Sequence, residues 1–254
     1  MKKVLLIDGD QFLFVACKAV EQEIRWDDQN HVLWGNAVEA RRNFDGMLQR
    51  IFDRFKTTEH VLCFSTDADK PNFRLGIDSS YKGHRDDRKP MCYKALRVDV
   101  ESAYRCLAMD HLEADDVMGI LATKPQRYSP VIVSRDKDMK TIPTSIWDGK
   151  DLVVQSEAEA DRFHLYQTLV GDTADGYPGC PGIGPVKAEK LLTHVLENHE
   201  SPSTSALWHC AVVPAYVKAG LTEADALVQA RLARILRFSD WDSENKKPIL
   251  WSPQ

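Results

Sequence analysis

Carboxylate side chains occur in five short groups along this sequence, and they are its clearest candidates for chemistry. The groups are Asp8 and Asp10; Asp67; Glu113, Asp115 and Asp116; Asp136 and Asp138; and Asp172 and Asp175. Two carboxylates about 4 Å apart repel each other by roughly 4 kcal/mol at an effective dielectric constant near 20. A pocket that gathered most of these groups would therefore need divalent cations. Hard oxygen ligands favour Mg²⁺, for which Mn²⁺ can substitute.

Short apolar runs precede three of the five groups and must position them. Residues 4–7, 60–65 and 130–134 are rich in Val, Ile, Leu, Cys and Phe. Their lack of polar alternation is typical of strands that are buried on both faces of a parallel sheet. An amphipathic stretch over 36–55 lies between the first two runs and predicts a helix. This alternation predicts an α/β fold whose strand ends bring the acidic groups to one edge of the sheet.

The rest of the chain is expected to contain more helix than strand. The remaining expected elements are, in chain order, one or two strands in 145–155, a helix over 157–170, a polar loop over 201–206, a helix over 222–238 and a short irregular tail. Ser156 with Glu159 three residues later matches a capping box at the first of these helices, and Thr222 is the expected cap of the second.

The first acidic pair, in the run LLIDGD, is open to two interpretations besides metal binding. An Asp that follows an apolar strand often only caps the next helix. The spacing of Asp8 and Asp10 also resembles the DxD pair of haloacid-dehalogenase phosphatases, in which the first Asp is the nucleophile and the second is the general acid. That family also needs a later Lys and a further acidic pair, and Lys137 between Asp136 and Asp138 matches this requirement poorly.

In the next two groups, local capping and metal binding compete as explanations. Glu113, Asp115 and Asp116 precede an apolar helical run, and a helix N-terminus favours anions. Three acids in four residues exceed what capping requires, which favours metal binding. Asp136 and Asp138 follow a predicted strand and would point the same way in extended backbone. They fit a ligand pair and an ordinary turn equally well.

A glycine- and proline-rich segment over 171–200 is the sharpest local signal. The run PGIGP precedes an amphipathic helix, as in a helix-hairpin-helix motif. Gly182 and Gly184 permit a tight turn that exposes backbone amides, and Pro185 suits the first helical turn. Together with Lys187 and Lys190, these amides would bind DNA phosphates without reading sequence. The alternative is a loop before an ordinary surface helix.

A basic segment over 81–97 lies between the second and third acidic groups. Its first residues, Tyr81, Lys82, His84 and Arg85, combine positive charge with an aromatic ring, as a single-stranded nucleic acid requires. The run 86–89 fits a solvated surface. A formal net charge of −5 argues at first against a nucleic-acid partner, but bound metal would offset most of the charge of the acidic groups.

Composition excludes several other classes of protein. Hydrophobic residues make up 43% and charged residues 28% of the sequence, as in ordinary soluble proteins. The six cysteines contain no CxxC pair and predict reduced thiols in an intracellular protein. No apolar stretch approaches the ~20 residues that span a bilayer, and no signal peptide is evident. The eight histidines form no zinc-binding pattern.

Taken together, these motifs resemble the 5′-nuclease (flap endonuclease) superfamily, in particular the stand-alone bacteriophage 5′–3′ exonucleases and the 5′-nuclease domain of bacterial DNA polymerase I. The resemblance runs from about residue 4 to about residue 200. The motifs that carry it, in order, are LLIDGD, STDADKPNFR, YKGHR, LEADD, SRDKD and GDTADGYPGCPGIGPVKAEKLL.

The resemblance implies a domain plan. Residues 1–156 would form a PIN-like nuclease core, with a short arch region at about 81–111. Residues 157–254 would form a helical region, with the helix-hairpin-helix at about 171–200. Only 27 residues separate Arg85 from Glu113, which is short for an arch that encloses a threaded strand. Whether a 5′ strand threads through the protein therefore stays open.

The resemblance also implies roles for the acidic and basic residues. The first metal would be held by Asp8, Asp67, Glu113 and Asp115, and the second by Asp115, Asp136, Asp138 and Asp172, with Asp116 and Asp175 as auxiliary ligands. The family pattern does not fix an acid at Asp10. Lys82 and Arg85 would contact the scissile phosphate. The helix-hairpin-helix would grip duplex DNA, in the family often with a K⁺ ion bound to its carbonyls.

The implied activity is two-metal hydrolysis of DNA near 5′ ends, flaps or junctions, in replication or repair. A PIN-like ribonuclease or an RNase H-type activity is one alternative, and a non-catalytic DNA-binding relative is another. A monomer is expected, with a polymerase as a candidate partner and no membrane association. If the protein is encoded by a bacteriophage, it would act in the cytoplasm of the bacterial host.

Overall fold

A mostly parallel sheet forms the centre of the molecule. The computed structural model describes residues 2–27, 29–66, 69–84, 88–198 and 203–253. In these ranges a six-stranded sheet has the order β5-β4-β1-β6-β7-β8. Its strands are β1 (Lys3–Asp8), β4 (His60–Phe64), β5 (Cys106–Ala108), β6 (Ser129–Val133), β7 (Ser145–Trp147) and β8 (Leu152–Val154). All neighbouring pairs are parallel except β7 and β8. The predicted α/β fold and the strands predicted at 4–7, 60–65 and 130–134 are thus confirmed.

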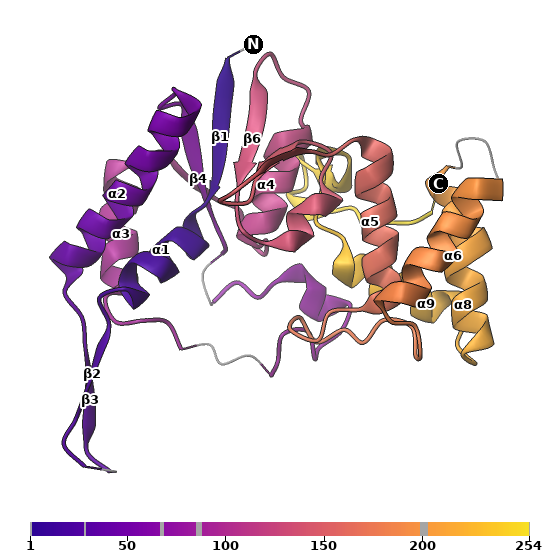
Figure 1. The fold of residues 1–254 in the computed structure, drawn as a ribbon, viewed down its shortest axis with the longest axis horizontal. Coiled ribbons are helices and arrows are strands. Elements are labelled where there is room, and N and C mark those ends of the chain that lie inside the picture. The colour runs from indigo at the N-terminus through magenta and orange to yellow at the C-terminus, as the bar shows by residue number, and fades with distance from the viewer. Residues whose placement is uncertain (1, 28, 67–68, 85–87, 199–202, 254) are drawn as a thin grey trace.

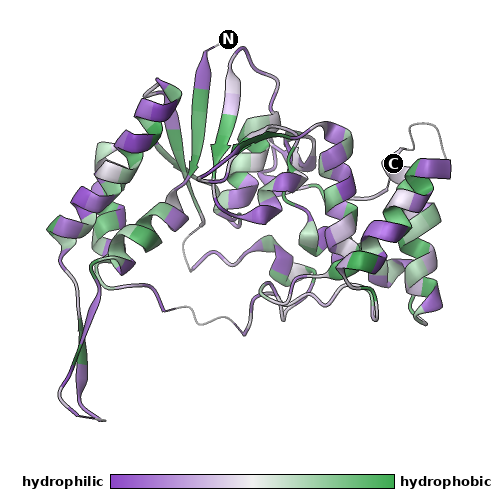
Figure 2. Ribbon diagram, in the orientation of Figure 1, coloured by the Kyte–Doolittle hydropathy of each residue, from purple (hydrophilic) through white to green (hydrophobic). Residues whose placement is uncertain are grey.

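Helices cover both faces of the sheet (Figure 1). Three helices lie on one face, namely α1 (Gly9–Lys18), α2 (Ala37–Phe55) and α3 (Tyr93–Ala103). Their buried side chains, such as Leu13, Phe44 and Leu96, pack against β1 and β4. On the other face, α4 (Ala114–Thr123) packs through Val117 and Met118. The central strands are therefore apolar along both faces, and Figure 2 shows them green between mixed helices.

Side-chain caps set the starts of several helices, and one of them is a capping box that the sequence predicts. Asn36 caps α2, because its side chain accepts hydrogen bonds from the amides of Val38 and Glu39. Ser156 and Glu159 form the predicted capping box of α5 (Glu157–Val170). After α5 and a glycine-rich turn, α6 (Pro185–Asn198) begins at its proline.

The last part of the chain departs from its prediction. Thr222 caps α9 (Glu223–Ala233) as expected, but this helix ends at Ala233 and does not continue to 238. The chain then returns to the central sheet, where Ile235 and Leu236 pack with α4. A Cβ atom on Gly119 would lie only 2.3 Å from the Leu236 carbonyl oxygen, so this close approach requires glycine. Residues from the region expected to form a separate helical part, 157–254, therefore pack against the part expected at 1–156.

Two further segments also differ from their predictions. Ser203 caps a short helix, α7 (Thr204–Leu207), within the expected polar loop. The expected irregular tail contains the 3₁₀ turn η4 (Phe238–Asp240) and an antiparallel pair of strands, β9 (Trp241–Asp242) and β10 (Lys247–Pro248). Both differences involve elements of two to four residues, which are too short to give a periodic signal.

The arch region was predicted at about 81–111, and much of this segment is regular structure. Residues 93–108 contain α3 and β5, and the α3 side chains Tyr93 and Val100 belong to the buried core beneath the sheet. Residues 81–84 and 88–92 precede these two elements. Residues 85–87 lie outside the described residues.

A β-hairpin that the sequence analysis did not predict projects from the body of the molecule (Figure 1). It consists of β2 (Gln22–Arg25) and β3 (His31–Trp34), which pair antiparallel with Ile24 opposite Val32. Ile24, Val32 and Trp34 share one face of the hairpin and are 44%, 47% and 47% exposed. The hairpin therefore carries an apolar face that the described residues leave uncovered.

The helices after residue 156 pack around a core of their own. This unit contains α5, α6, α7, η3 (Trp208–Val212), α8 (Val213–Lys218) and α9. Trp208 and Tyr216 are fully buried in it beside Leu165. In the part of the chain that the structure describes, no helix is long and apolar enough to cross a membrane.

His164 makes the stability of this helical unit sensitive to acid. Its ring is fully buried, lies edge-on to Trp251, and its Nε2 is 2.8 Å from the Ala230 carbonyl oxygen. Burial, with a smaller contribution from the Arg234 charge, lowers the pKa of His164 to about 3. The unfolded chain binds a proton at this histidine below about pH 6.5, whereas the folded chain stays neutral. Its stabilising contribution is therefore complete above that pH and is lost as the pH falls toward 3.

We expect wild type to lose about 2 kcal/mol more unfolding free energy than His164→Gln between pH 7 and pH 5. Glutamine keeps a donor for Ala230 but does not titrate. Urea unfolding of both proteins at these two pH values measures the difference. Equal acid sensitivity of the two proteins would mean that His164 is not the titrating group.

Candidate active site and metal centre

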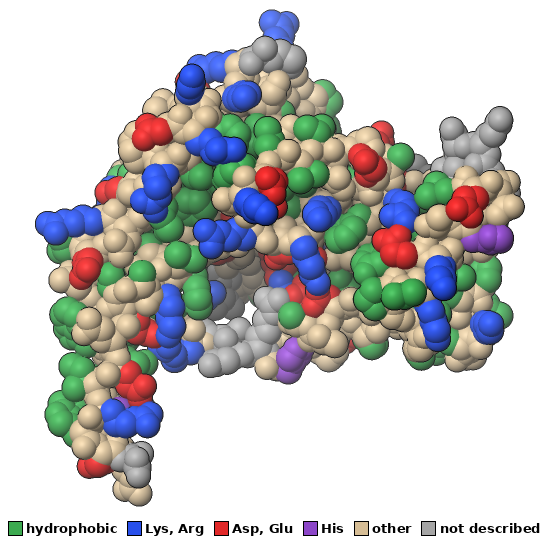
Figure 3. Space-filling view, in the orientation of Figure 1, with side chains coloured by type: hydrophobic (Ala, Val, Ile, Leu, Met, Phe, Trp, Pro, Cys, Tyr) green, Lys and Arg blue, Asp and Glu red, His purple; other side chains and the backbone are tan. Residues whose placement is uncertain are grey.

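A cavity of about 410 Å³ opens at the edge of the sheet where the parallel strands end. Asp8 is the last residue of β1, Asp136 follows β6, and Glu113 with Asp115 stands at the start of α4. All four carboxylates line the cavity, as does Asp10. Four of the five acidic groups therefore contribute a carboxylate to this cavity or to its smaller extension. The sequence analysis predicted that the acidic groups meet at one edge of the sheet. Figure 3 shows a hollow on this face between the hairpin and the helical unit, with acidic and basic side chains at its margin.

A smaller extension of about 80 Å³ continues this cavity. Glu113, Asp115 and Asp136 line both spaces, and Asp138 and Asp175 are reached only in the extension. The carboxylates thus form one continuous acidic surface. Asp67, which was predicted to be a ligand of the first metal, lies outside the described residues.

The carboxylates of the cavity repel one another strongly. Burial, with the charges of Asp10 and Asp136, raises the pKa of Asp8 to about 6. Burial and the neighbouring carboxylates Asp8, Asp136 and Glu113 raise the pKa of Asp115 well above its usual value. Burial and Asp136 likewise raise the pKa of Asp138 to about 7. These side chains would be stabilised in their charged form by added positive charge.

The donor set fits hydrated divalent cations. Within the described ranges, no three histidine, cysteine or carboxylate side chains meet at one point that would itself hold a metal ion. Mg²⁺ does not require such a cage, because it commonly keeps several water molecules and binds through one or two carboxylates. An open cavity with oxygen-only acidic ligands suits this mode of binding.

Glu113 is held in its charged form by two cations from the preceding connection. Lys82 Nζ lies 2.5 Å from Glu113 Oε1, and Arg74 Nη1 lies 3.4 Å from Glu113 Oε2. Burial alone would raise the pKa of Glu113, but Lys82 and Arg74 together lower it. Lys82 also has a left-handed backbone (φ 56°), which is uncommon outside glycine and concentrates at functional sites.

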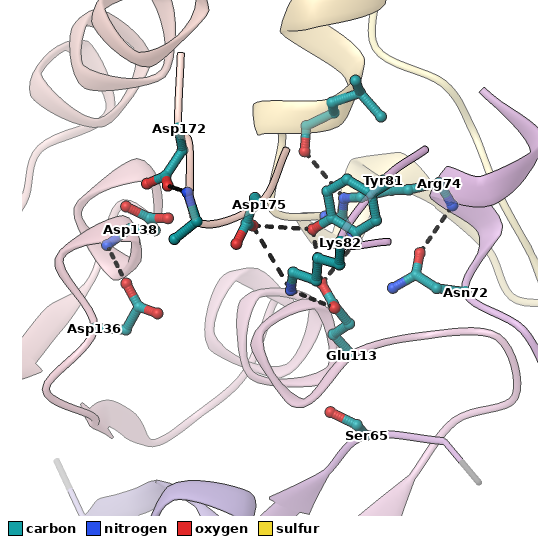
Figure 4. Close-up of polar contacts among 12 residues, drawn as sticks. Ser65, Asn72, Arg74, Tyr81, Lys82, Glu113, Asp136, Asp138, Asp172 and Asp175 are labelled. Carbon is teal, nitrogen blue, oxygen red and sulfur yellow. Dashed lines mark hydrogen bonds and ion pairs between the residues drawn. The ribbon is translucent and has the colours of Figure 1, made fainter. Parts of the chain in front are cut away.

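Tyr81 lies beneath the site and is only 5% exposed, although it was predicted to contact DNA. Its hydroxyl group is 3.2 Å from Glu113 and 3.1 Å from Asp175. The Lys82 amide donates to the Asp175 carbonyl oxygen at 2.9 Å. These bonds join the basic segment to the GDTAD turn, as Figure 4 shows. Tyr81 thus positions two carboxylates, and Arg85 lies outside the described residues.

Asp116 occupies a different position from its neighbour Asp115. Its carboxylate is fully buried and forms two 2.8 Å hydrogen bonds with the Arg74 guanidinium group. It also accepts from the Leu236 amide at 3.1 Å. Asp116 therefore supports the site from below and does not line either cavity space, in contrast to the auxiliary ligand role predicted for it.

Arg74 is the functional residue that the sequence analysis missed. It is 2% exposed and donates to the carbonyl oxygens of Leu232 and Arg234 as well as to Asp116. It thus joins the connection after β4 to α4 and to the returning C-terminal segment. It stands within the quoted run STDADKPNFR, but no local spacing signals a partner more than 150 residues away.

Asp10 and Asp172 each form hydrogen bonds or an ion pair with other residues of the protein. Asp10 accepts from the Ser65 amide and the Tyr93 hydroxyl group, each at 2.7 Å. Asp172 forms an ion pair with Lys137 at 3.0 Å and does not line the described cavity spaces. Asp10 thus lines the cavity while it also fixes the end of β4.

The SRDKD segment combines the two interpretations that its sequence left open. The Asp136 side chain accepts from the Asp138 amide at 2.8 Å, as in an ordinary capped turn. Both carboxylates nevertheless line the cavity extension. Gln167 of α5 donates to Asp138 at 2.6 Å and was not predicted to take part. Figure 4 shows Asp136, Asp138 and Asp172 grouped on one side of the extension.

The glycine turn before α6 is open to solvent. Gly182 has φ +75°, and a Cβ atom on Gly182 or Gly184 would meet no other atom within 4 Å. Backbone groups are therefore accessible there. Lys187 Nζ bonds back to the Gly182 carbonyl oxygen at 2.8 Å, whereas Lys190 is exposed one turn later.

Comparisons with known proteins agree with this geometry. A family model described as 5′-3′ exonuclease, N-terminal resolvase-like domain, matches residues 3–164. The chain is 31% identical over 285 residues to the exodeoxyribonuclease of Enterobacteria phage T3, covering 100% of this chain and 94% of that protein. It is 31% identical over 284 residues to the exonuclease of Escherichia phage T7, covering 99% and 94%.

Solved structures show the same fold at lower sequence identity. The flap endonuclease of bacteriophage T5, in a complex with DNA and metal ions, superposes with a TM-score of 0.56. The two chains are 14% identical, and the match covers 91% of this chain and 93% of that one.

Proposed function

Because the chain belongs to the 5′-3′ exonuclease family, we propose that it is a metal-dependent nuclease that hydrolyses DNA near 5′ ends, flaps or single-strand/duplex junctions. The observation that carries this proposal is the cavity at the sheet edge that joins Asp8, Glu113, Asp115 and Asp136. A role in DNA replication or repair follows from this substrate class. A single chain supplies the whole cavity, which fits a monomer.

Two groups of carboxylates would hold two Mg²⁺ ions. Asp8, Glu113 and Asp115 line the larger space and would bind the first ion together with Asp67. Asp136 and Asp138 line the extension and would bind the second, with Asp115 between the two and Asp172 nearby. Bound Mg²⁺ supplies a water molecule of lowered pKa and stabilises negative charge on the phosphate.

The chain's own cations would bind and orient the phosphodiester. Lys82, Lys70 and Lys89 line the larger cavity and provide positive charge beside its acidic wall. Lys82 already contacts Glu113, so its ammonium group stands at the margin between carboxylates and solvent. A phosphate that entered there would find a fixed donor, as electrostatic stabilisation of its developing charge requires. Arg85 would add a second donor.

The turn before α6 would hold the duplex part of the substrate as a helix-hairpin-helix. Gly182 and Gly184 leave space for a DNA backbone, and the amides at the start of α6 favour a phosphate. The carbonyl groups of the same turn offer ligands for K⁺. The related flap endonuclease of bacteriophage T5, whose solved complex contains DNA and metal ions, supports the same substrate class for this chain.

The test is the length of the products from a 5′-labelled flap duplex with Mg²⁺ and with EDTA. We expect cleavage only with Mg²⁺. One cut near the junction means a structure-specific endonuclease, and mono- or dinucleotides mean a mainly exonucleolytic enzyme. An RNA strand in place of the flap tests the ribonuclease alternative. A gel shift without any cleavage would contradict the proposal and favour a DNA-binding protein.

Mg²⁺ should also raise the melting temperature, because it offsets the repulsion among the buried carboxylates. A cation at 100 times its Kd stabilises the folded state by about 2.7 kcal/mol. Thermal unfolding in Mg²⁺ and in EDTA measures this effect without any nuclease assay. An unchanged melting temperature would mean that the cavity does not bind the ion.

A further inference from the structure

A second cavity, of about 260 Å³, adjoins the carboxylate cavity and has a different chemistry. It lies among α1, α2 and the ends of β6 and β7. Phe12, Ile51 and Trp147 are among its apolar lining residues, and the arginines 50, 54 and 135 are at its margin. We name it the arginine pocket. No carboxylate is among its described lining residues.

The arginines of this pocket lack the anionic partners that surface arginines commonly have. In the described part of the chain, the side chains of Arg50 and Arg135 form no hydrogen bond or ion pair. The Arg54 guanidinium group stacks on the Trp147 ring at 3.8 Å from the ring centroid, which leaves its N–H edge free to donate. Three cations around one space repel one another, so a phosphate ligand would be strongly favoured there.

The floor of the pocket suits a flat apolar group. Trp147 closes the back of the pocket, but it is only 6% exposed, with Arg54 over its ring face and Phe55 at its edge, so it offers no free face to a base. Phe12 and Ile51 are partly buried hydrophobic side chains packed against the same core. A nucleobase stacks on an aromatic ring such as that of Phe12 by about 1–3 kcal/mol without regard to sequence. The pocket therefore combines a place for a base with a place for a phosphate.

The arginine pocket and the carboxylate cavity share a wall. Gln11 lines both spaces, and its side chain accepts from the Arg135 amide at 3.1 Å. Ser134 lines the arginine pocket and donates to Asp8 at 3.0 Å. A group bound in the arginine pocket would thus lie next to a phosphodiester at Asp8.

We propose that the arginine pocket binds one deoxynucleotide of the strand being cut, with its base on the apolar floor and its phosphate on the arginines. The ligand class is a deoxynucleoside 5′-monophosphate, which is the terminal unit of a 5′-phosphorylated strand. The inference rests on the proposed nuclease function, because it places this nucleotide beside the bond that is hydrolysed. The pocket would thus hold the 5′ end of the DNA strand beside the carboxylate cavity.

Isothermal titration with dTMP in EDTA tests the inference without catalysis. We expect saturable binding by the wild type and at least about tenfold weaker binding by R50A/R135A, because two charge-assisted contacts are lost. R42A is the matched control, since Arg42 is an exposed residue of the same helix that does not line the pocket. It should bind dTMP as the wild type does. Circular dichroism verifies that the variants are folded.

Two further ligands separate the parts of the site. Thymidine and inorganic phosphate should each bind more weakly than dTMP if base and phosphate are both recognised. Equal binding of phosphate and dTMP would overturn the base site, and equal binding by R50A/R135A and wild type would overturn the arginine site. Wild-type protein that cleaves the flap with Mg²⁺ but does not bind dTMP would refute this inference alone. Protein that binds dTMP but cleaves nothing would refute the proposed function.

Discussion

Asp115→Asn is expected to lower the rate of DNA cleavage by at least about 10²–10³-fold while DNA affinity stays near that of the wild type. Asp115 lines both the main cavity and its extension, as Glu113 and Asp136 do. Its pKa is raised well above the usual value by burial first and then by Asp8, Asp136 and Glu113. An amide of the same shape removes the charge that a shared metal position needs. It also relieves repulsion, so the fold should not be weakened.

The comparison uses flap cleavage and a gel shift on the same preparations. Asp53→Asn is the matched control, because Asp53 is an exposed carboxylate on α2 that lines neither cavity. It should leave both measurements unchanged. If Asp115→Asn abolished DNA binding while the protein stayed folded, Asp115 would be a substrate-positioning residue and its assignment to the metals would be wrong.

Arg74→Met should lower the free energy of unfolding by about 3–5 kcal/mol. The substitution leaves the fully buried Asp116 carboxylate without its bidentate partner. It also leaves the carbonyl oxygens of Leu232 and Arg234 without a donor. A buried charge without a partner costs far more than an exposed ion pair contributes.

Urea unfolding measures this loss of stability, and two further variants serve as comparisons. Lys2→Met removes an exposed ion pair with Glu59 and should cost less than about 1 kcal/mol. The double variant R74M/D116L removes both buried charges and should recover part of the lost stability. A double variant no more stable than Arg74→Met would mean that the backbone contacts of Arg74, and not the ion pair, carry its effect.

Sequence patterns predicted the parts of the site that depend on local geometry. Asp8 and Asp136 follow apolar runs, and parallel strands end at the same edge, so their convergence follows from the pattern of burial. The capping box at Ser156 and the cap at Thr222 were equally local. Each of these features needs only a few neighbouring residues to specify it.

The remaining features depend on contacts between distant segments. Asp115 and Asp116 are adjacent acids, but successive helical positions point about 100° apart. One therefore faces the cavity and the other faces Arg74. No local rule assigns the two faces before the packing of α4 is known. The arginine pocket likewise joins α1, α2 and the ends of β6 and β7, which are remote in sequence.

The contact between Asp116 and Leu236 has a consequence for the newly made chain. These two residues are 120 positions apart, and the Leu236 amide completes the hydrogen bonding of the Asp116 carboxylate. At about 5–20 residues per second, a ribosome needs on the order of 6–24 s to make that stretch. All of the acidic residues of the site are therefore synthesised before the segment that completes the hydrogen bonding of Asp116. A nascent chain that has not reached residue 236 therefore carries the Asp116 carboxylate without one of its hydrogen-bond donors.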